Sequence, residues 1–266
     1  MKTSPRINAI AIIASIALLI PISINWYSFL ARTISDDNDT SVNPLKYNIL
    51  TDSTAAVSKC LYLGIDTISI PEKVLINGND YTITCIGNKA FKNCSGLKSI
   101  EIPESVTSIG KYAFEYCSSL KSIKIPASVT SIEESTFNGC YKLNNVEIPE
   151  SVTHIGNSAF KFCYSLESIK IPASVTSIEE ITFNGCSKLR NVEIPESVTS
   201  IGKYAFQNCS RLYSIEIPTN VTKIEDYAFD GCNNLRVIIY YNSGDDVVIG
   251  YNAFKGCESI TYKYTE

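Results

Sequence analysis

Apolar residues recur at fixed positions along most of this chain, with a period of 23 residues. Within one period, a Leu-x-x-Ile-x-Ile stretch alternates with polar residues at every second position, which predicts a short β-strand with one buried face. A proline follows and ends the strand, because proline cannot donate a hydrogen bond to a neighbouring strand. In the first complete period, the predicted buried residues are Leu97, Ile100, Ile102, Val106, Ile109, Ala113, Phe114 and Cys117.

Three residue types keep this 23-residue step over most of the chain. They are proline at Pro103, Pro126, Pro149, Pro172, Pro195 and Pro218, phenylalanine at Phe91, Phe114, Phe137, Phe160, Phe183, Phe206 and Phe229, and cysteine at Cys94, Cys117, Cys140, Cys163, Cys186, Cys209 and Cys232. A fixed period of about 20 to 30 residues predicts a solenoid, in which each coil stacks on its neighbours. This interpretation replaces the one or two globular domains that the length alone would suggest.

The second half of each period predicts less regular structure. Val106 and Ile109 carry the chain across the far side of the coil, with a second short extended piece at 107–109. The segment KYAFEYC, residues 111–117, is too short for a stable helix alone, so we expect a single helical or 3₁₀ turn. Phe114 would be the main core side chain of its coil.

Ten cysteines raise the question of disulfides. Equivalent residues of neighbouring coils lie about 4.8 Å apart, with parallel Cβ directions that do not suit a disulfide bond. We therefore interpret the cysteine column as small buried thiols, against the alternatives of some disulfides, a zinc site or a nucleophile. Cys60 and Cys85 lie outside the column and are the candidate pair if any disulfide forms.

Both ends of the chain diverge from the repeat. Lys2 and Arg6 precede an apolar run at 7–24, which predicts an export signal peptide or a signal-anchor helix, with a plain buried helix as the third alternative. Acidic residues after this run favour export of the C-terminal part. The predicted organisation is 1–31 signal peptide or signal-anchor helix, 32–45 flexible linker, 46–85 N-terminal cap and divergent repeat with a turn at 77–80, 86–237 regular repeats, and 238–266 divergent C-terminal repeat and cap.

Tyrosines gather in the last segment of the chain. They form an aromatic edge that predicts either a C-terminal cap or part of a contact surface. The five residues are Tyr240, Tyr241, Tyr251, Tyr262 and Tyr264.

Charged residues alternate in sign at the outward position after the central isoleucine of each strand. We expect this column to keep the coils in register, since neighbouring coils place opposite charges side by side; a charged binding strip is the alternative. The column is Glu101, Lys124, Glu147, Lys170, Glu193 and Glu216. IPES segments likewise alternate with IPAS, so the unit of duplication is partly 46 residues.

Candidate chemistry is sparse. The net charge of −4, with acidic and basic residues interspersed, gives no basic patch for nucleic acid. The only histidine, His154, occupies a slot that serine holds in sister coils, which leaves a cysteine or serine nucleophile without a dedicated base. We find no phosphate-binding, dinucleotide-binding or calcium-binding motif. We therefore expect no enzyme, no cofactor, no metal site and no small-molecule substrate.

At this level of detail the repeat LKSIEIPESVTSIGKYAFEYCSS resembles the BspA-like, or Treponema pallidum type, leucine-rich repeat, with the pattern LxxIxIPxSVTxIGxxAFxxCxx. The resemblance covers about residues 60–260. It implies a right-handed solenoid with a parallel β-sheet on the concave face and a short helical or irregular convex side. It also implies a cell-surface or secreted protein, with members linked to adhesion and to host or matrix binding. The family offers no catalytic residues.

The predicted function is therefore that of a non-enzymatic, exported or cell-surface protein that binds a protein or glycoprotein, adhesin-like, with membrane anchoring if the N-terminal segment is retained. The alternative is a structural spacer or self-assembling scaffold without a dedicated ligand. One strand-face column varies while its neighbours stay constant, which either marks a contact surface or reflects neutral drift. Its residues are Lys98, Lys121, Asn144, Glu167, Arg190, Tyr213 and Arg236.

Overall fold

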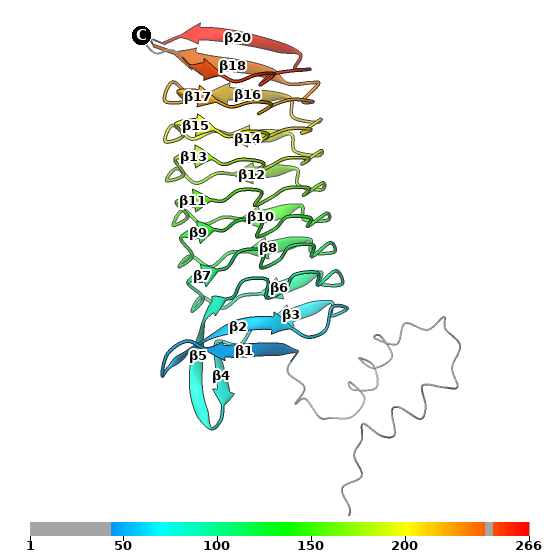
Figure 1. The fold of residues 1–266 in the computed structure, drawn as a ribbon, viewed down its shortest axis with the longest axis vertical. Helices are drawn as coiled ribbons and strands as arrows, with labels where there is room; N and C mark the ends of the chain where they lie inside the picture. Colours follow the sequence, from blue (N-terminus) through cyan, green and yellow to red (C-terminus); the bar gives the residue numbers. More distant parts are fainter. Residues whose placement is uncertain (1–43, 243–246, 266) are drawn as a thin grey trace, which may run out of the picture. The chain divides into compact units, whose positions relative to one another are not determined.

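The structure is a computed structural model that describes residues 44–242 and 247–265. In this part of the chain the backbone winds into coils that stack on one another, with a strand on each of two sides of the coil (Figure 1). Strands of successive coils pair in parallel. The predicted solenoid of parallel strands is therefore confirmed.

The first ladder of strands contains the Leu-x-x-Ile-x-Ile stretches. Residues 23 positions apart lie opposite each other, as Ile123 does with Val146 and Ile169 with Val192. The central residue of these short strands is buried and its two neighbours are exposed, as the alternation predicts. The ladder consists of β3 (Thr67–Ser69), β6 (Ser99–Glu101), β8 (Ser122–Lys124), β10 (Asn145–Glu147), β12 (Ser168–Lys170), β14 (Asn191–Glu193), β16 (Ser214–Ile217), β18 (Arg236–Tyr241) and β20 (Ser259–Tyr264).

A second ladder of two-residue strands follows the prolines on another side of the coil. It confirms the short extended piece that was predicted near Ile109, which lies opposite Ile86, the first residue of the predicted regular repeats. Its strands are β7 (Ser108–Ile109), β9 (Ser131–Ile132), β11 (His154–Ile155), β13 (Ser177–Ile178), β15 (Ser200–Ile201), β17 (Lys223–Ile224) and β19 (Val248–Ile249).

Phenylalanine rings form a continuous stack through the centre of the coils. The side chains from Phe91 to Phe229 at the 23-residue step are all fully buried. Neighbouring rings lie face to face, with centroids 5.2 Å apart for Phe91 and Phe114 and 5.4 Å apart for Phe137 and Phe160. Aromatic pairs at this spacing attract one another in addition to burying apolar area, so the stack links each coil to the next.

The segment KYAFEYC is not helical, and the predicted helical or 3₁₀ turn is wrong. The described residues contain no helix, and 111–117 form a run of turns. The N–H groups of Tyr112, Phe114 and Tyr116 donate to carbonyls of the next coil, at 2.8–3.0 Å, while those between them bond within the coil. Tyr112 and Tyr116 also have positive φ, at 60° and 58°. In a helix, these N–H groups would bond to carbonyls within the same segment. Here every second N–H bonds to the next coil instead, so a helix does not form.

The first coil is covered by a sheet of β1 (Leu45–Ile49), β2 (Thr54–Cys60), β5 (Asn79–Ile86) and β4 (Lys73–Ile76). Strands β4 and β5 form an antiparallel hairpin around the predicted turn, where Asn77 and Gly78 have positive φ of 53° and 84°. Ala55 and Val57 of β2 and Ile83 of β5 are fully buried. It thereby shields the apolar core of the first coil from water.

The apolar run at 7–24, the predicted signal or anchor, lies outside the described residues, as does nearly all of the predicted linker. The last residue of that linker, Leu45, is buried and begins β1. Within the part of the chain that the structure describes, no helix has the length and apolar character to cross a membrane.

Candidate interaction surface

The variable column forms one continuous line on the outer face of the first ladder. All seven of its residues are exposed, and six of them stand directly before a strand of this ladder. Their backbones are joined from coil to coil: the Asn144 N–H donates to the carbonyl of Lys121 at 2.9 Å, and that of Arg190 to Glu167 at 3.0 Å. Side chains of different character are therefore held in one row on a rigid backbone.

The two ends of this column are paired within the protein. Lys98 Nζ lies 2.8 Å from Asp66, and Arg236 Nη2 lies 2.8 Å from Glu258. The Arg236 guanidinium also lies over the ring of Tyr213, 5.0 Å from its centroid. Both ion pairs are exposed, so solvent screens them and they leave the charges open to a partner.

Arg236 departs from the column by one position. It pairs with Ser214, and Val237 pairs with Ile215, so this coil is one residue shorter between the conserved leucine slot and its strand. Counting in steps of 23 therefore assigns Arg236 to the slot of Tyr213, whereas the strand register assigns it to the next. Its side chain still reaches the Tyr213 ring.

The charged column has the predicted register but different ion pairs. Strand pairing puts Lys124 beside Glu147 and Lys170 beside Glu193. Neither lysine forms its ion pair with that neighbour among the described residues. Opposite charges therefore do lie side by side on neighbouring strands, but the ion pairs between coils are formed with other glutamates.

The lysines instead reach the glutamates of the preceding IPES segments. Lys124 Nζ lies 3.5 Å from Glu104, and Lys170 Nζ lies 2.6 Å from Glu150. The hydrogen bond from Lys170 holds the pKa of Glu150 below its ordinary range. Glu104 also accepts a hydrogen bond from the N–H of Ala127 at 3.2 Å, within the following IPAS segment. The same lysine–glutamate contact between unlike coils thus recurs at the 46-residue step.

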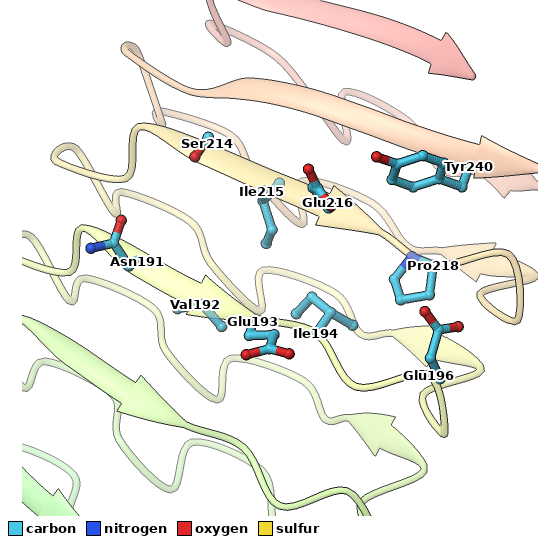
Figure 2. Close-up of a pocket in the computed structure, with 10 residues that line it drawn as sticks. All are labelled: Asn191, Val192, Glu193, Ile194, Glu196, Ser214, Ile215, Glu216, Pro218 and Tyr240. Carbon is cyan, nitrogen blue, oxygen red and sulfur yellow. The ribbon is translucent and has the colours of Figure 1, made fainter.

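The alternation fails after the third IPES segment, beside a hollow that carboxylates line. Glu193, Glu196 and Glu216 border a depression of about 370 Å³ that Tyr240 also lines (Figure 2). Its lining lacks a lysine because Glu216 stands where the pattern would place one. Among the ion pairs within the described residues, none involves these three carboxylates. We did not predict this hollow, although glutamate at 216 in place of lysine signalled the acidic character of its lining.

The cysteine column consists of buried free thiols, as predicted. The six thiols from Cys117 to Cys232 each donate to the carbonyl of a phenylalanine in the preceding coil, for example Cys117 to Phe91 at 3.1 Å and Cys186 to Phe160 at 3.2 Å. Burial raises the pKa of Cys186 to about 12, which keeps its thiol protonated and unreactive at neutral pH.

The candidate disulfide between Cys60 and Cys85 is not formed, because both are free thiols. The Cys60 thiol donates to the carbonyl of Tyr62 at 3.5 Å, and a hydrogen bond from Cys94 lowers the pKa of Cys60 to about 7. His154 is exposed on β11. Within 44–242 and 247–265, no three His, Cys, Asp or Glu side chains are grouped to hold a metal ion.

Comparison with known proteins agrees with this architecture. The BspA type leucine rich repeat region matches the chain in 6 copies, over residues 74–188 and 154–265. A solved leucine-rich repeat protein from Bacteroides ovatus ATCC 8483 is similar, with 28% identity and a TM-score of 0.70, and the match covers 85% of this chain and 71% of that one. The T. pallidum leucine-rich repeat protein TpLRR is also similar, with 28% identity, a TM-score of 0.65, and coverage of 74% and 90%. None of the curated proteins matches. The chain therefore belongs to the BspA type leucine rich repeat family.

Proposed function

We propose that this protein is a non-enzymatic binding protein whose strand face contacts another protein or glycoprotein, in the manner of an adhesin. The variable column is the observation that carries this proposal. Its side chains are free of core packing, differ in charge and size, and stand on a backbone ladder that fixes their spacing. A preorganised row of this kind loses little conformational freedom when a partner docks.

Tyr213 is the proposed centre of the contact. Its side chain is 53% exposed and carries the Arg236 guanidinium over one face, with Arg190 in the coil before it. Tyrosine and arginine are the residues that most often dominate the binding energy of protein interfaces. No other member of the column is aromatic.

Charge defines the chemistry of the partner. Arg190 and Arg236 stand at one end of strands β14 and β18, and the acidic hollow of Glu193, Glu196 and Glu216 borders the same group of strands farther along (Figure 2). A complementary partner carries anionic groups opposite the arginines and basic side chains opposite the hollow. Such a pattern fixes the orientation of the partner and speeds its association.

The proposed location is the cell surface or the extracellular space. Lys2 and Arg6 before the apolar run at 7–24 support export, and retention of that run would anchor the protein to the membrane. Both fates leave the repeats outside the cell, where an adhesin needs them.

Site-specific photo-crosslinking on native cells tests the proposed function. A photoreactive amino acid replaces Tyr213 in one variant and Lys111, in the turn segment, in a matched control. We expect one dominant crosslinked partner from position 213, absent from position 111 and competed by added unlabelled protein. The same crosslinks from both positions, or none from position 213, would contradict the proposal.

A further inference from the structure

Cationic side chains gather on the two rows that flank the buried leucine column. The leucine of each coil, from Leu97 to Leu235, is fully buried, and the residues directly before and after it form two rows near the starts of the strands. These two rows hold seven cationic side chains and one carboxylate, that of Glu167. The seven cations, which we call the basic corner, are all exposed: Lys98, Lys121, Lys142, Lys188, Arg190, Arg211 and Arg236.

Carboxylates gather at the other end of the same strands. The charged column and the residues that directly follow the prolines hold seven glutamates and two lysines there. Figure 2 shows Glu193 farther along its strand than Asn191, which directly follows Arg190. Three residue steps separate Arg190 from Glu193, about 10 Å along an extended strand. The charges that are interspersed along the sequence, which predicted no basic patch, are therefore separated on the surface.

Most of the basic corner has no anionic partner within the described residues. Lys98 and Arg236 form ion pairs with Asp66 and Glu258, whereas the other five cations form none within 44–242 and 247–265. Equivalent residues of neighbouring coils lie about 4.8 Å apart, so like charges in these rows repel one another. A polyanion that lies along the two rows would relieve this repulsion.

We propose that the basic corner binds a linear sulfated polysaccharide, as carried by a glycoprotein. Sulfate groups stay ionised at neutral pH, and arginine side chains such as Arg190 and Arg211 bind oxyanions through two parallel hydrogen bonds. Asn144, Ser165 and Asn234 stand between the cations and can form hydrogen bonds with sugar hydroxyls. The cations extend over seven coils, about 29 Å, so a polymer with repeated anionic groups matches them better than a single small anion.

The aromatic residues of this region favour a glycan over a nucleic acid. Proteins that bind single-stranded nucleic acid stack its bases on exposed ring faces. Here Tyr141 and Tyr164 stack on each other, with centroids 5.2 Å apart, and the Arg236 guanidinium covers one face of Tyr213. These contacts leave few ring faces for bases, while the tyrosine hydroxyl groups can bond to sugars. A broad duplex would also meet the carboxylates at the strand ends.

An acidic peptide is the nearest alternative among polyanions. Its carboxylates repel one another along a flexible chain, so ordering the peptide across seven coils costs conformational entropy at every residue. A sulfated polysaccharide has a stiffer chain and therefore loses less conformational freedom when it binds. The rigid spacing of the basic corner thus favours the polysaccharide.

Binding of the purified full chain, in non-ionic detergent, to immobilised heparin tests this inference. We expect binding at about 0.15 M salt and its loss at about 1 M, where charges are screened beyond about 3 Å. Lys188→Ala combined with Arg211→Ala should weaken binding at least about tenfold and leave the urea midpoint unchanged, because both side chains are exposed. Lys124→Ala combined with Lys170→Ala removes the same charge at the other end of the strands and should bind as the wild type does.

Three results would overturn this inference. The first is no binding to heparin at about 0.15 M salt. The second is equal weakening in the two double variants. The third is an affinity for another polyanion equal to that for heparin, with hyaluronan, which carries carboxylates but no sulfate, single-stranded DNA and polyglutamate as the polyanions compared.

The inference rests on the proposed function in one respect, because it names the chemistry of a partner that docks beside Tyr213. The two can still fail separately, since Lys188 and Arg211 lie outside the variable column and heparin binding needs no cells. Heparin binding without a crosslinked partner at position 213 would contradict the proposed function alone. A crosslinked partner without heparin binding would overturn the sulfated ligand alone.

Discussion

The thiol of Cys163 donates a hydrogen bond to the carbonyl oxygen of Phe137, 3.3 Å away in the preceding coil. The same contact recurs between Cys140 and Phe114 at 3.2 Å and between Cys209 and Phe183 at 3.2 Å. Cysteine is small enough for this tight corner and still offers a donor, which alanine or valine would not. The cysteine column is thus a coil-to-coil link as well as a packing layer.

Alkaline pH should destabilise the protein through these thiols. Burial raises the pKa of Cys163 well above its ordinary value of 9.0, so the folded state keeps a proton that the unfolded state loses. The stabilisation is fully present below pH 9 and is lost as the pH rises above 9, at about 1.4 kcal/mol per pH unit for each thiol. Urea unfolding at pH 8 and pH 10 measures this loss.

The matched variant for that experiment is Cys163→Ala. It lacks one of the buried thiols, so its stability should fall less between pH 8 and pH 10 than that of the wild type, by about 1.4 kcal/mol. An equal fall in both proteins would show that Cys163 does not contribute to the pH dependence.

Shortening one ring of the phenylalanine stack should be costly. Phe160 is fully buried and stacks on Phe137 and Phe183, with centroids 5.4 and 5.6 Å away. Phe160→Ala should lower the free energy of unfolding by about 3–5 kcal/mol, because it leaves a cavity between two rings. Phe162→Gly is the control: Phe162 is only half-buried and has a φ of 59°, which glycine adopts freely. Similar losses in the two variants would contradict the central role of the stack.

Relieving backbone strain should stabilise the protein. Ile181 has a φ of 62°, in the left-handed region that a β-branched side chain rarely occupies. The equivalent residues two coils away and one coil away are Ser135 and Ser158, which tolerate this conformation better. We expect Ile181→Asn to raise the free energy of unfolding by about 0.5–1 kcal/mol, measured by urea titration. A lower urea midpoint would mean that lost packing outweighs the strain.

Export can be tested on intact native cells by brief protease treatment. Peptides from residues 86–260 should be released while the cells remain intact, and mass spectrometry identifies them. Release only after lysis would exclude an extracellular strand face and, with it, the adhesin-like role.

The periodicity predicts the solenoid so well because equal positions of successive coils become neighbours in space. A column in the sequence, such as that of Phe114 and Phe137, is therefore a contact in the structure. The buried thiols, the two strand ladders and the exposed variable column all follow from this relation. These features can be predicted without knowing which distant parts of the chain contact one another.

Other features depend on which of several hydrogen-bond or ion-pair partners a group selects, and the 23-residue period does not reveal this. The turn segment around Phe114 is not helical, because alternate N–H groups of this segment bond to the next coil. The long side chain of Lys170 forms an ion pair with Glu150 and not with Glu193, its neighbour on the next strand.

The most direct test of the account measures affinity for the partner captured through position 213. We predict that Tyr213→Ala weakens binding at least about tenfold while the urea midpoint stays unchanged, since truncating a central aromatic residue costs about 2 kcal/mol or more in protein interfaces. Lys111→Ala should bind as the wild type does. Equal affinity of Tyr213→Ala and the wild type, with both proteins folded, would contradict the claim that the strand face binds the partner.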